Sequence, residues 1–119
     1  MKKPSPAELH LLETLSRLGP STVRDLHNEL EGEVVYTTVL KQLQVLLGKG
    51  LVQRDASGRS HIYTVAVEPK AARRGMLQDF VAKVFAGSTR DLILGALGSD
   101  EITDEQREQI ARILSEGEE

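Results

Sequence analysis

The sequence lacks cysteine and tryptophan, and its only aromatic residues are two tyrosines and two phenylalanines among 119 residues. Without cysteine, the chain has no disulfide, no thiolate nucleophile and no thiolate metal ligand, which fits a reducing compartment. No apolar run reaches the roughly 20 residues that span a membrane. The N-terminal stretch MKKPSPAEL has no apolar core of a signal peptide. We therefore expect a cytoplasmic protein with no membrane partner.

Signatures of catalysis and of cofactor binding are missing too. The sequence has no phosphate-binding P-loop, no G-x-G-x-x-G and no nucleophile elbow. His10, His27 and His61 have no histidine or carboxylate at the helical spacing of a metal site. The acidic residues of segment 100–119 lack the spacing of a calcium loop. We expect neither an enzyme nor a cofactor or metal site.

Charge is divided unevenly along the chain, whose net charge is −3. Residues 1–75 contain 11 Lys and Arg against 8 Asp and Glu, whereas residues 76–119 contain 4 against 10. A mildly basic part joined to an acidic part suits a protein that faces nucleic acid with its first part only.

Residues 34–50, VVYTTVLKQLQVLLGKG, predict one amphipathic helix. Its apolar residues recur at the spacing of a single stripe, and they are Val39, Leu40, Leu43, Leu46 and Leu47. The opposite face carries Thr37, Thr38, Lys41, Gln44, Val45 and Gly48. Small polar, amide and cationic groups of this kind reach phosphates and base edges in the DNA major groove. An ordinary solvated helix face is the alternative.

Two shorter helices are predicted before this one. Ser5-Pro6-Ala7-Glu8 is a capping box with proline at the first helical position, and Gly19-Pro20 ends the helix that follows. Ser21 or Thr22 begins the second helix. Three short helices with short connections form a trihelical core, with the third helix packed on the other two.

A β-hairpin is predicted directly after the third helix. Residues 51–54 and 60–65 read as strands around the turn Asp55-Ala56-Ser57-Gly58. A hairpin in this place is the wing of a winged helix-turn-helix. Because recognition helices lead with their N-terminal residues and wings contact phosphates, the candidate DNA-binding residues are Tyr36, Thr37, Thr38, Lys41, Gln42, Arg54, Arg59 and His61. Tyr36 has packing at the helix start as an equal alternative.

From Pro69 onward the pattern is helical, with apolar stripes too broad for three small helices to bury alone. Residues 92–97 are apolar nearly all round, so that helix is expected to be buried. Burying one Leu, Ile or Phe side chain contributes roughly 1.5–3 kcal/mol, so a second copy of the chain is the simplest cover. The candidate dimerisation residues are Met76, Leu77, Phe80, Val81, Val84, Phe85, Leu92, Ile93, Leu97, Ile110, Ile113 and Leu114.

These elements predict a mainly α protein with a small β-hairpin wing. Residues 1–68 are expected to form a winged-helix DNA-binding domain, and residues 69–119 a helical homodimerisation element. Two-fold symmetry would pair two recognition helices on an inverted-repeat DNA site.

The series of short motifs resembles the BlaI/MecI/CopY family of winged-helix repressors, the penicillinase repressors. The matching pieces are Pro6-Ala7-Glu8, Tyr36-Thr37-Thr38-Val39, Leu46 with Lys49-Gly50-Leu51, Gly58-Arg59 with Tyr63, Phe85 with Gly87-Ser88, and Thr103-Asp104-Glu105. They follow the family's order over nearly the whole chain. The resemblance implies a homodimer that binds double-stranded DNA at a palindromic operator and represses transcription.

Three departures from the family pattern bear on function. Val45 and Gly48 stand where family members usually carry basic residues, which implies fewer phosphate contacts. The Asn-Phe bond that a membrane sensor protease cleaves in the penicillinase-type repressors is replaced here by Leu94-Gly95-Ala96-Leu97, so we do not expect induction by that cleavage. A possible upstream sensor protein is unknown. The absence of cysteine excludes the copper motif of other relatives.

Two other function classes stay open from the sequence. A winged-helix protein-interaction module would use the same helix face for a protein partner and bind no specific DNA. A ligand-responsive regulator would hold a small molecule within the dimer element, although the few aromatic residues give no positive sign of a pocket.

Overall fold

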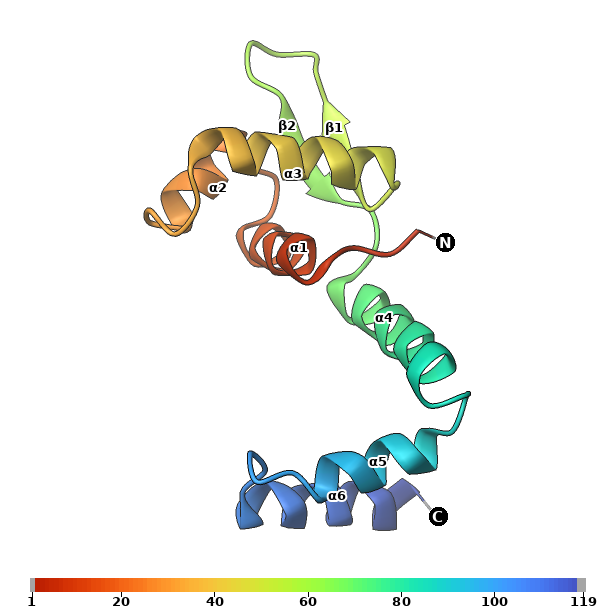
Figure 1. Ribbon diagram of the computed structural model, residues 1–119. Coiled ribbons are helices and arrows are strands. Elements are labelled where there is room, and N and C mark those ends of the chain that lie inside the picture. Colours follow the sequence, from red (N-terminus) through yellow and green to blue (C-terminus); the bar gives the residue numbers. More distant parts are fainter. Residues whose placement is uncertain (1, 118–119) are drawn as a thin grey trace. The chain divides into compact units, whose positions relative to one another are not determined.

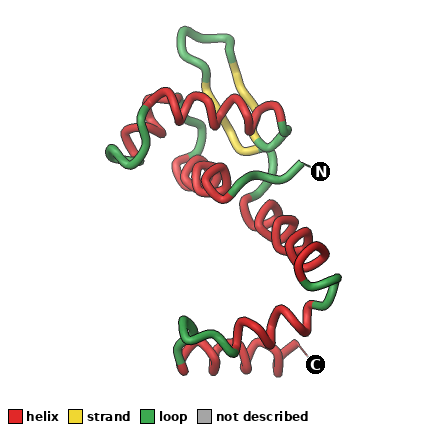
Figure 2. Tube along the Cα trace, viewed as in Figure 1, coloured by secondary structure: helices red, strands yellow, loops and turns green. Residues whose placement is uncertain are grey.

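The computed structural model describes residues 2–117, without the side chains at 114 and 116. In that range the chain forms six helices and one two-stranded antiparallel sheet (Figure 1). The elements are α1 (Pro6–Leu18), α2 (Val23–Glu29), α3 (Tyr36–Gly48), β1 (Val52–Asp55), β2 (Ile62–Val65), α4 (Pro69–Val84), α5 (Thr89–Leu97) and α6 (Asp104–Gly117). Helices dominate and the hairpin is the only sheet of the described chain (Figure 2), which confirms the predicted fold class.

The helix starts follow the predicted capping chemistry. At α1, the Glu8 amide donates to Ser5 Oγ at 3.2 Å, and the Ser5 amide donates to Glu8 Oε1 at 3.1 Å. Thr22 and Asp25 form the same reciprocal pair at α2, so Thr22 is the cap. Gly19 follows α1 with a φ of +83°, a left-handed conformation that glycine adopts without strain.

The core of the first part lies between α1, α2 and α3. Leu12, Leu26, Val39, Leu43 and Leu46 have no measurable exposure. Leu40 and Leu47 are partly buried against the same cluster, so the predicted stripe of α3 is confirmed. Because α3 buries this stripe, its opposite side is fixed as an outward face.

The hairpin follows α3 and is anchored at β2. Tyr63 is 1% exposed, and its backbone exchanges two hydrogen bonds with Ser21, at 2.8 and 3.1 Å. The predicted strands begin one or two residues too early, since residues 51, 60 and 61 lie outside the ladder. Because the two bonds between Tyr63 and Ser21 join β2 to the connection between α1 and α2, the wing is attached to that connection.

In the turn of the wing, the hydroxyl and amide of Ser57 donate to Asp55 and hold the pKa of that carboxyl below its usual range.

The chain divides into two compact units, with the boundary between Leu77 and Gln78 inside α4. The predicted functional division before Pro69 falls at the start of α4 and stays a prediction. None of the helices in the described range is both long and apolar enough to cross a membrane.

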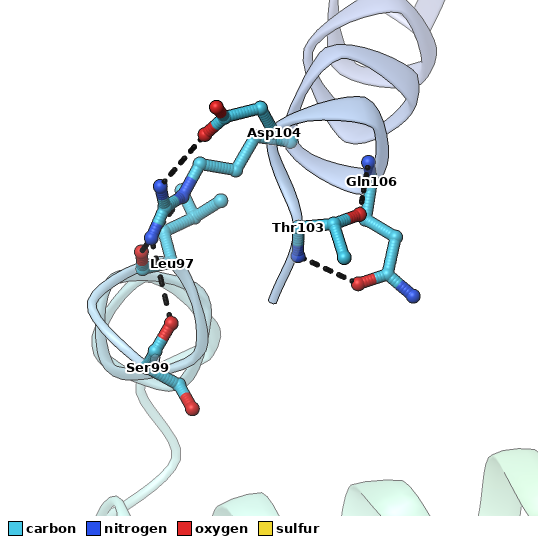
Figure 3. A network of polar contacts seen from close by, with 6 residues as sticks. Leu97, Ser99, Thr103, Asp104 and Gln106 are labelled. Atoms are coloured by element: carbon cyan, nitrogen blue, oxygen red, sulfur yellow. Dashed lines mark hydrogen bonds and ion pairs between the residues drawn. The ribbon is translucent and has the colours of Figure 1, made fainter. Parts of the chain in front are cut away.

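In the second unit, α5 and α6 are joined by one arginine. The guanidinium of Arg107 donates to the Leu97 carbonyl at 2.9 and 3.2 Å and to the Ser99 carbonyl at 3.4 Å (Figure 3). Leu97 is the last residue of α5, so Arg107 satisfies a carbonyl that the helix end leaves without an intrahelical partner. Thr103 and Gln106 form a reciprocal cap at the start of α6, with hydrogen bonds of 2.9 and 3.1 Å.

The prediction that helix 92–97 is buried is wrong for the single chain. No residue of α5 is buried, and Leu94 is 53% exposed. The two short helices α5 and α6 cover only part of each other's apolar surface. Among the candidate dimerisation residues, Val81 is buried, Leu77, Phe80, Val84 and Ile113 are exposed, Met76, Phe85, Leu92, Ile93, Leu97 and Ile110 are half-buried, and Leu114 lies outside the described side chains.

Candidate nucleic-acid interface

The outward face of α3 has a fully exposed central stripe. At 100° per residue, Thr37, Lys41, Gln44 and Gly48 fall within a narrow sector opposite the buried leucines. All four are exposed. The stripe therefore offers a hydroxyl, an ammonium and an amide along almost the whole length of the helix. Gln44 is not among the predicted site residues, although it shares the sector of Lys41.

Thr38 and Gln42 lie on one flank of this stripe and are half-buried. Val45 and Lys49 share that flank. Lys49 points inward, because its ammonium lies 2.6 Å from Glu8 Oε1 and donates to the Lys3 carbonyl at 3.0 Å. Lys41 is consequently the only cation on the outward side of α3 that is not engaged within the described chain.

The other flank of α3 borders a hollow of about 390 Å³. The start of α2 contributes Thr22 and Arg24, α3 contributes Tyr36, and the wing contributes Arg59, Ser60 and His61. Val23, Leu40 and Tyr63 complete the lining. We call this feature the α2–wing hollow. Three predicted residues, Tyr36, Arg59 and His61, meet here, whereas Thr37, Thr38, Lys41, Gln42 and Arg54 are outside its lining.

Tyr36 both packs and stays accessible. The Tyr36 and His27 rings meet in a T-shaped contact, with centroids 5.7 Å apart and planes at 79°. The Tyr36 side chain is nevertheless 41% exposed. The ring contact orients Tyr36 toward α2 and leaves part of it on the rim of the hollow, so the two predicted roles are compatible.

The charged side chains that line the hollow are all cationic or histidine, with no acidic residue among them. Two of these side chains carry a guanidinium group. Arg24 and Arg59 make no hydrogen bond or ion pair with any other residue in the range 2–117. By contrast, Arg17 pairs with Glu29, Arg73 with Glu13 and Arg107 with Asp104.

Arg24 is the residue that the sequence prediction missed. It lies in a seven-residue helix and belongs to no motif. Its relevance follows from tertiary structure, because the packing of α2 against α3 brings it to the same hollow as the wing. A signal in the sequence was its position two residues after the Thr22 cap, on the polar side of α2.

The three histidines lie in three different parts of the fold and do not form a common site. His10 is exposed on α1, His27 touches Tyr36, and His61 lies in the wing. Within residues 2–117, no group of three or more histidine, aspartate or glutamate side chains is placed to hold a metal ion.

Several solved winged-helix regulators have limited similarity to this chain. A mutant of ZitR from Lactococcus lactis, in which serine replaces a cysteine, is 18% identical with a TM-score of 0.49, over 97% of this chain and 73% of ZitR. A MepR-like protein complexed with pseudoligands is 18% identical with a TM-score of 0.48, over 94% of this chain and 72% of the other. A possible transcriptional regulator for arsenical resistance is 23% identical with a TM-score of 0.46, over 70% and 84%.

The family relation rests on the sequence. No curated protein matches the chain significantly. The sequence profile of the family described as "Penicillinase repressor" matches residues 4–116, which is nearly the whole chain. The predicted resemblance is thereby confirmed, and the chain belongs to the penicillinase repressor family of winged-helix transcriptional regulators.

Proposed function

We propose that this regulator is a DNA-binding repressor that acts as a homodimer on an inverted-repeat operator. Residues 1–68 would form the DNA-binding domain, with α3 in the major groove and the wing on the backbone, and residues 69–119 the dimerisation element. The observation that carries the proposal is the exposed polar stripe of α3 beside the carboxylate-free α2–wing hollow. Membership of the repressor family supports the same function.

The chemistry of the central stripe suits base edges and phosphates. The Gln44 amide can donate and accept in one plane, as adenine requires in the major groove. Thr37 offers a hydroxyl and a methyl group, and Lys41 offers a cation for guanine or phosphate. Since this stripe projects away from the core, an approaching duplex would meet it without rearrangement of α3.

The exposed apolar side chains of the second part support a homodimer. Leu77, Phe80 and Val84 recur on one face of α4 and are 50, 47 and 59% exposed. Leu94 of α5 and Ile113 of α6 are 53 and 66% exposed. Large exposed apolar surfaces mark interaction sites, and a second copy of the chain brings a matching surface under two-fold symmetry.

DNA binding is tested by fluorescence anisotropy with the inverted repeat of the chain's own promoter. We expect Lys41→Ala and Arg59→Ala each to weaken binding by about 3- to 10-fold and to lower its salt dependence. Arg74→Ala, which removes an equal charge from the exposed side of α4, is the control and should bind as the wild type does. Unchanged affinity and salt dependence in both test variants would contradict this docking.

Dimerisation is tested by sedimentation velocity. We expect the wild type to sediment as a dimer and Phe80→Ser to shift it toward monomer, because the substitution removes apolar area from the surface proposed to be covered. The matched control is Leu18→Ser, which changes an exposed leucine of α1. A wild-type monomer at every accessible concentration would refute the homodimer.

A further inference from the structure

The α2–wing hollow brings two arginines without partners to one concavity. Arg54, Arg74, Arg90 and Arg112 also have no partner within the described chain, but they lie outside this hollow. Arg17, Arg73 and Arg107 each lie 2.6 to 3.4 Å from a carboxylate oxygen. Arg24 and Arg59 have no such partner in the described chain, and no acidic side chain lines the hollow between them. Two guanidinium groups brought to one concavity without a counter-charge favour an anion from outside.

The other polar groups of the hollow are also donors. The Thr22 hydroxyl accepts the Asp25 amide at 3.1 Å, which leaves its own proton free to donate. The Asp25 carboxylate is engaged with the Thr22 amide at 3.0 Å. Tyr36 and Ser60 add two more hydroxyls to the lining. The volume of about 390 Å³ corresponds to roughly a dozen waters at about 30 Å³ each, enough for one tetrahedral anion and its hydration.

We propose that the α2–wing hollow binds one phosphate of the DNA backbone, held between Arg24 of α2 and Arg59 of the wing. Guanidinium groups bind phosphate oxygens through two parallel hydrogen bonds, which makes arginine suited to this role. The inference rests on the proposed DNA binding and adds Arg24 as a contact residue. It also assigns α2, together with α3 and the wing, a direct part in docking.

The position of the hollow explains why the backbone is the source of the phosphate. Tyr36 and Leu40 of its lining precede Thr37 and Lys41 of the central stripe by one residue each. A duplex whose major groove receives that stripe therefore has one edge of the groove beside the hollow. The edges of a groove are formed by the sugar-phosphate backbones, which present the phosphates. A phosphate contact on this flank would fix the register of α3 on the duplex, but it would not itself distinguish one DNA sequence from another.

The test compares wild type, Arg24→Ala, Arg24→Lys and the control Arg74→Ala by anisotropy between about 50 and about 200 mM KCl. Arg24→Ala should bind about tenfold more weakly, equally on the operator and on a scrambled duplex, because a phosphate contact is blind to sequence. Its plot of log affinity against log salt should be less steep by about 0.9 for each hollow that contacts the duplex. Arg24→Lys should keep the slope and lose part of the affinity.

Folding and the source of the phosphate are controlled separately. Arg24 is exposed and has no partner within residues 2–117, so Arg24→Ala should melt as the wild type does. Inorganic phosphate should compete with the duplex no better than potassium chloride of equal ionic strength. Competition above that level, abolished by Arg24→Ala, would overturn the backbone source in favour of a free phosphate ligand.

Two results separate this inference from the proposed function. If the wild type binds the operator and Arg24→Ala matches Arg74→Ala in affinity and in salt dependence, phosphate binding by the α2–wing hollow is refuted while DNA binding stands. If the wild type binds no duplex, the proposed function itself is refuted, and with it the proposed binding of a backbone phosphate in the α2–wing hollow.

Discussion

Lys49 at the end of α3 and Glu8 in the first turn of α1 form an ion pair, with Nζ and Oε1 2.6 Å apart. Their side chains are only 25 and 14% exposed. Lys49 also donates to the Lys3 carbonyl at 3.0 Å. The contact holds α3 against α1 and removes Lys49 from the unengaged cations on the outward side of α3.

Lys49→Met should destabilise the winged-helix part by about 1–2 kcal/mol, because it removes a hydrogen bond between charged groups that are largely shielded from water. The thermal or urea unfolding of the purified variants measures this change. Lys41→Met is the matched control and should be near neutral, since Lys41 is exposed. Equal stability of the two variants would show that the ion pair contributes nothing.

The same pair makes stability depend on pH. Burial raises the pKa of Glu8, but the hydrogen bonds from Lys49 and Ser5 and the charge of Lys49 outweigh it and hold the pKa below its ordinary value of 4.5. A lowered folded-state pKa contributes stability above pH 4.5, and the contribution is lost as pH falls through the lowered value. The difference in melting temperature between wild type and Lys49→Met should therefore be largest near neutrality and shrink below pH 4.5. A constant difference down to about pH 3 would contradict this linkage.

Much of this fold follows from local sequence patterns. The caps at Ser5, Thr22 and Thr103 and the leucine stripe of α3 depend on residues within one or two turns of each other, so they are readable without a structure. The partner of Lys49 is 41 positions away, and the meeting of Arg24 with Arg59 depends on how α2 packs. The exposure of α5 could not be predicted from the sequence either. An apolar pattern indicates that a surface is to be buried, but not whether the residues that bury it belong to the same chain.

Restoring a cation at Gly48 should strengthen DNA binding. Gly48 lies on the central stripe, and a Cβ added there meets no atom within 4 Å. Gly48→Lys should raise operator affinity and steepen the salt dependence by about 0.9 for each new phosphate contact. It should also stabilise α3 by about 0.5–1 kcal/mol, because glycine is a poor helix former. Ala71→Lys, which adds the same charge to α4, is the control; an equal gain there would indicate only non-specific attraction.

Arg107 should hold the α5–α6 pair together. Arg107→Ala removes the donors to the Leu97 and Ser99 carbonyls. We expect faster amide hydrogen exchange at the end of α5 and a loss of about 1 kcal/mol in local stability. Arg112→Ala changes an exposed arginine of the same helix and serves as the control. Exchange that is the same in both variants would mean that the apolar contacts alone hold the two helices.

The spacing of the two half-sites tests the account of a symmetric dimer on DNA most directly. Anisotropy titrations would compare the promoter's inverted repeat with a duplex that carries about 5 extra base pairs between its halves, which turns one half-site to the opposite side of the helix. The account predicts two chains per intact operator and a fall to non-specific affinity on the lengthened duplex. Equal affinity for both duplexes would contradict it, because two recognition helices fixed by one dimer cannot serve both spacings.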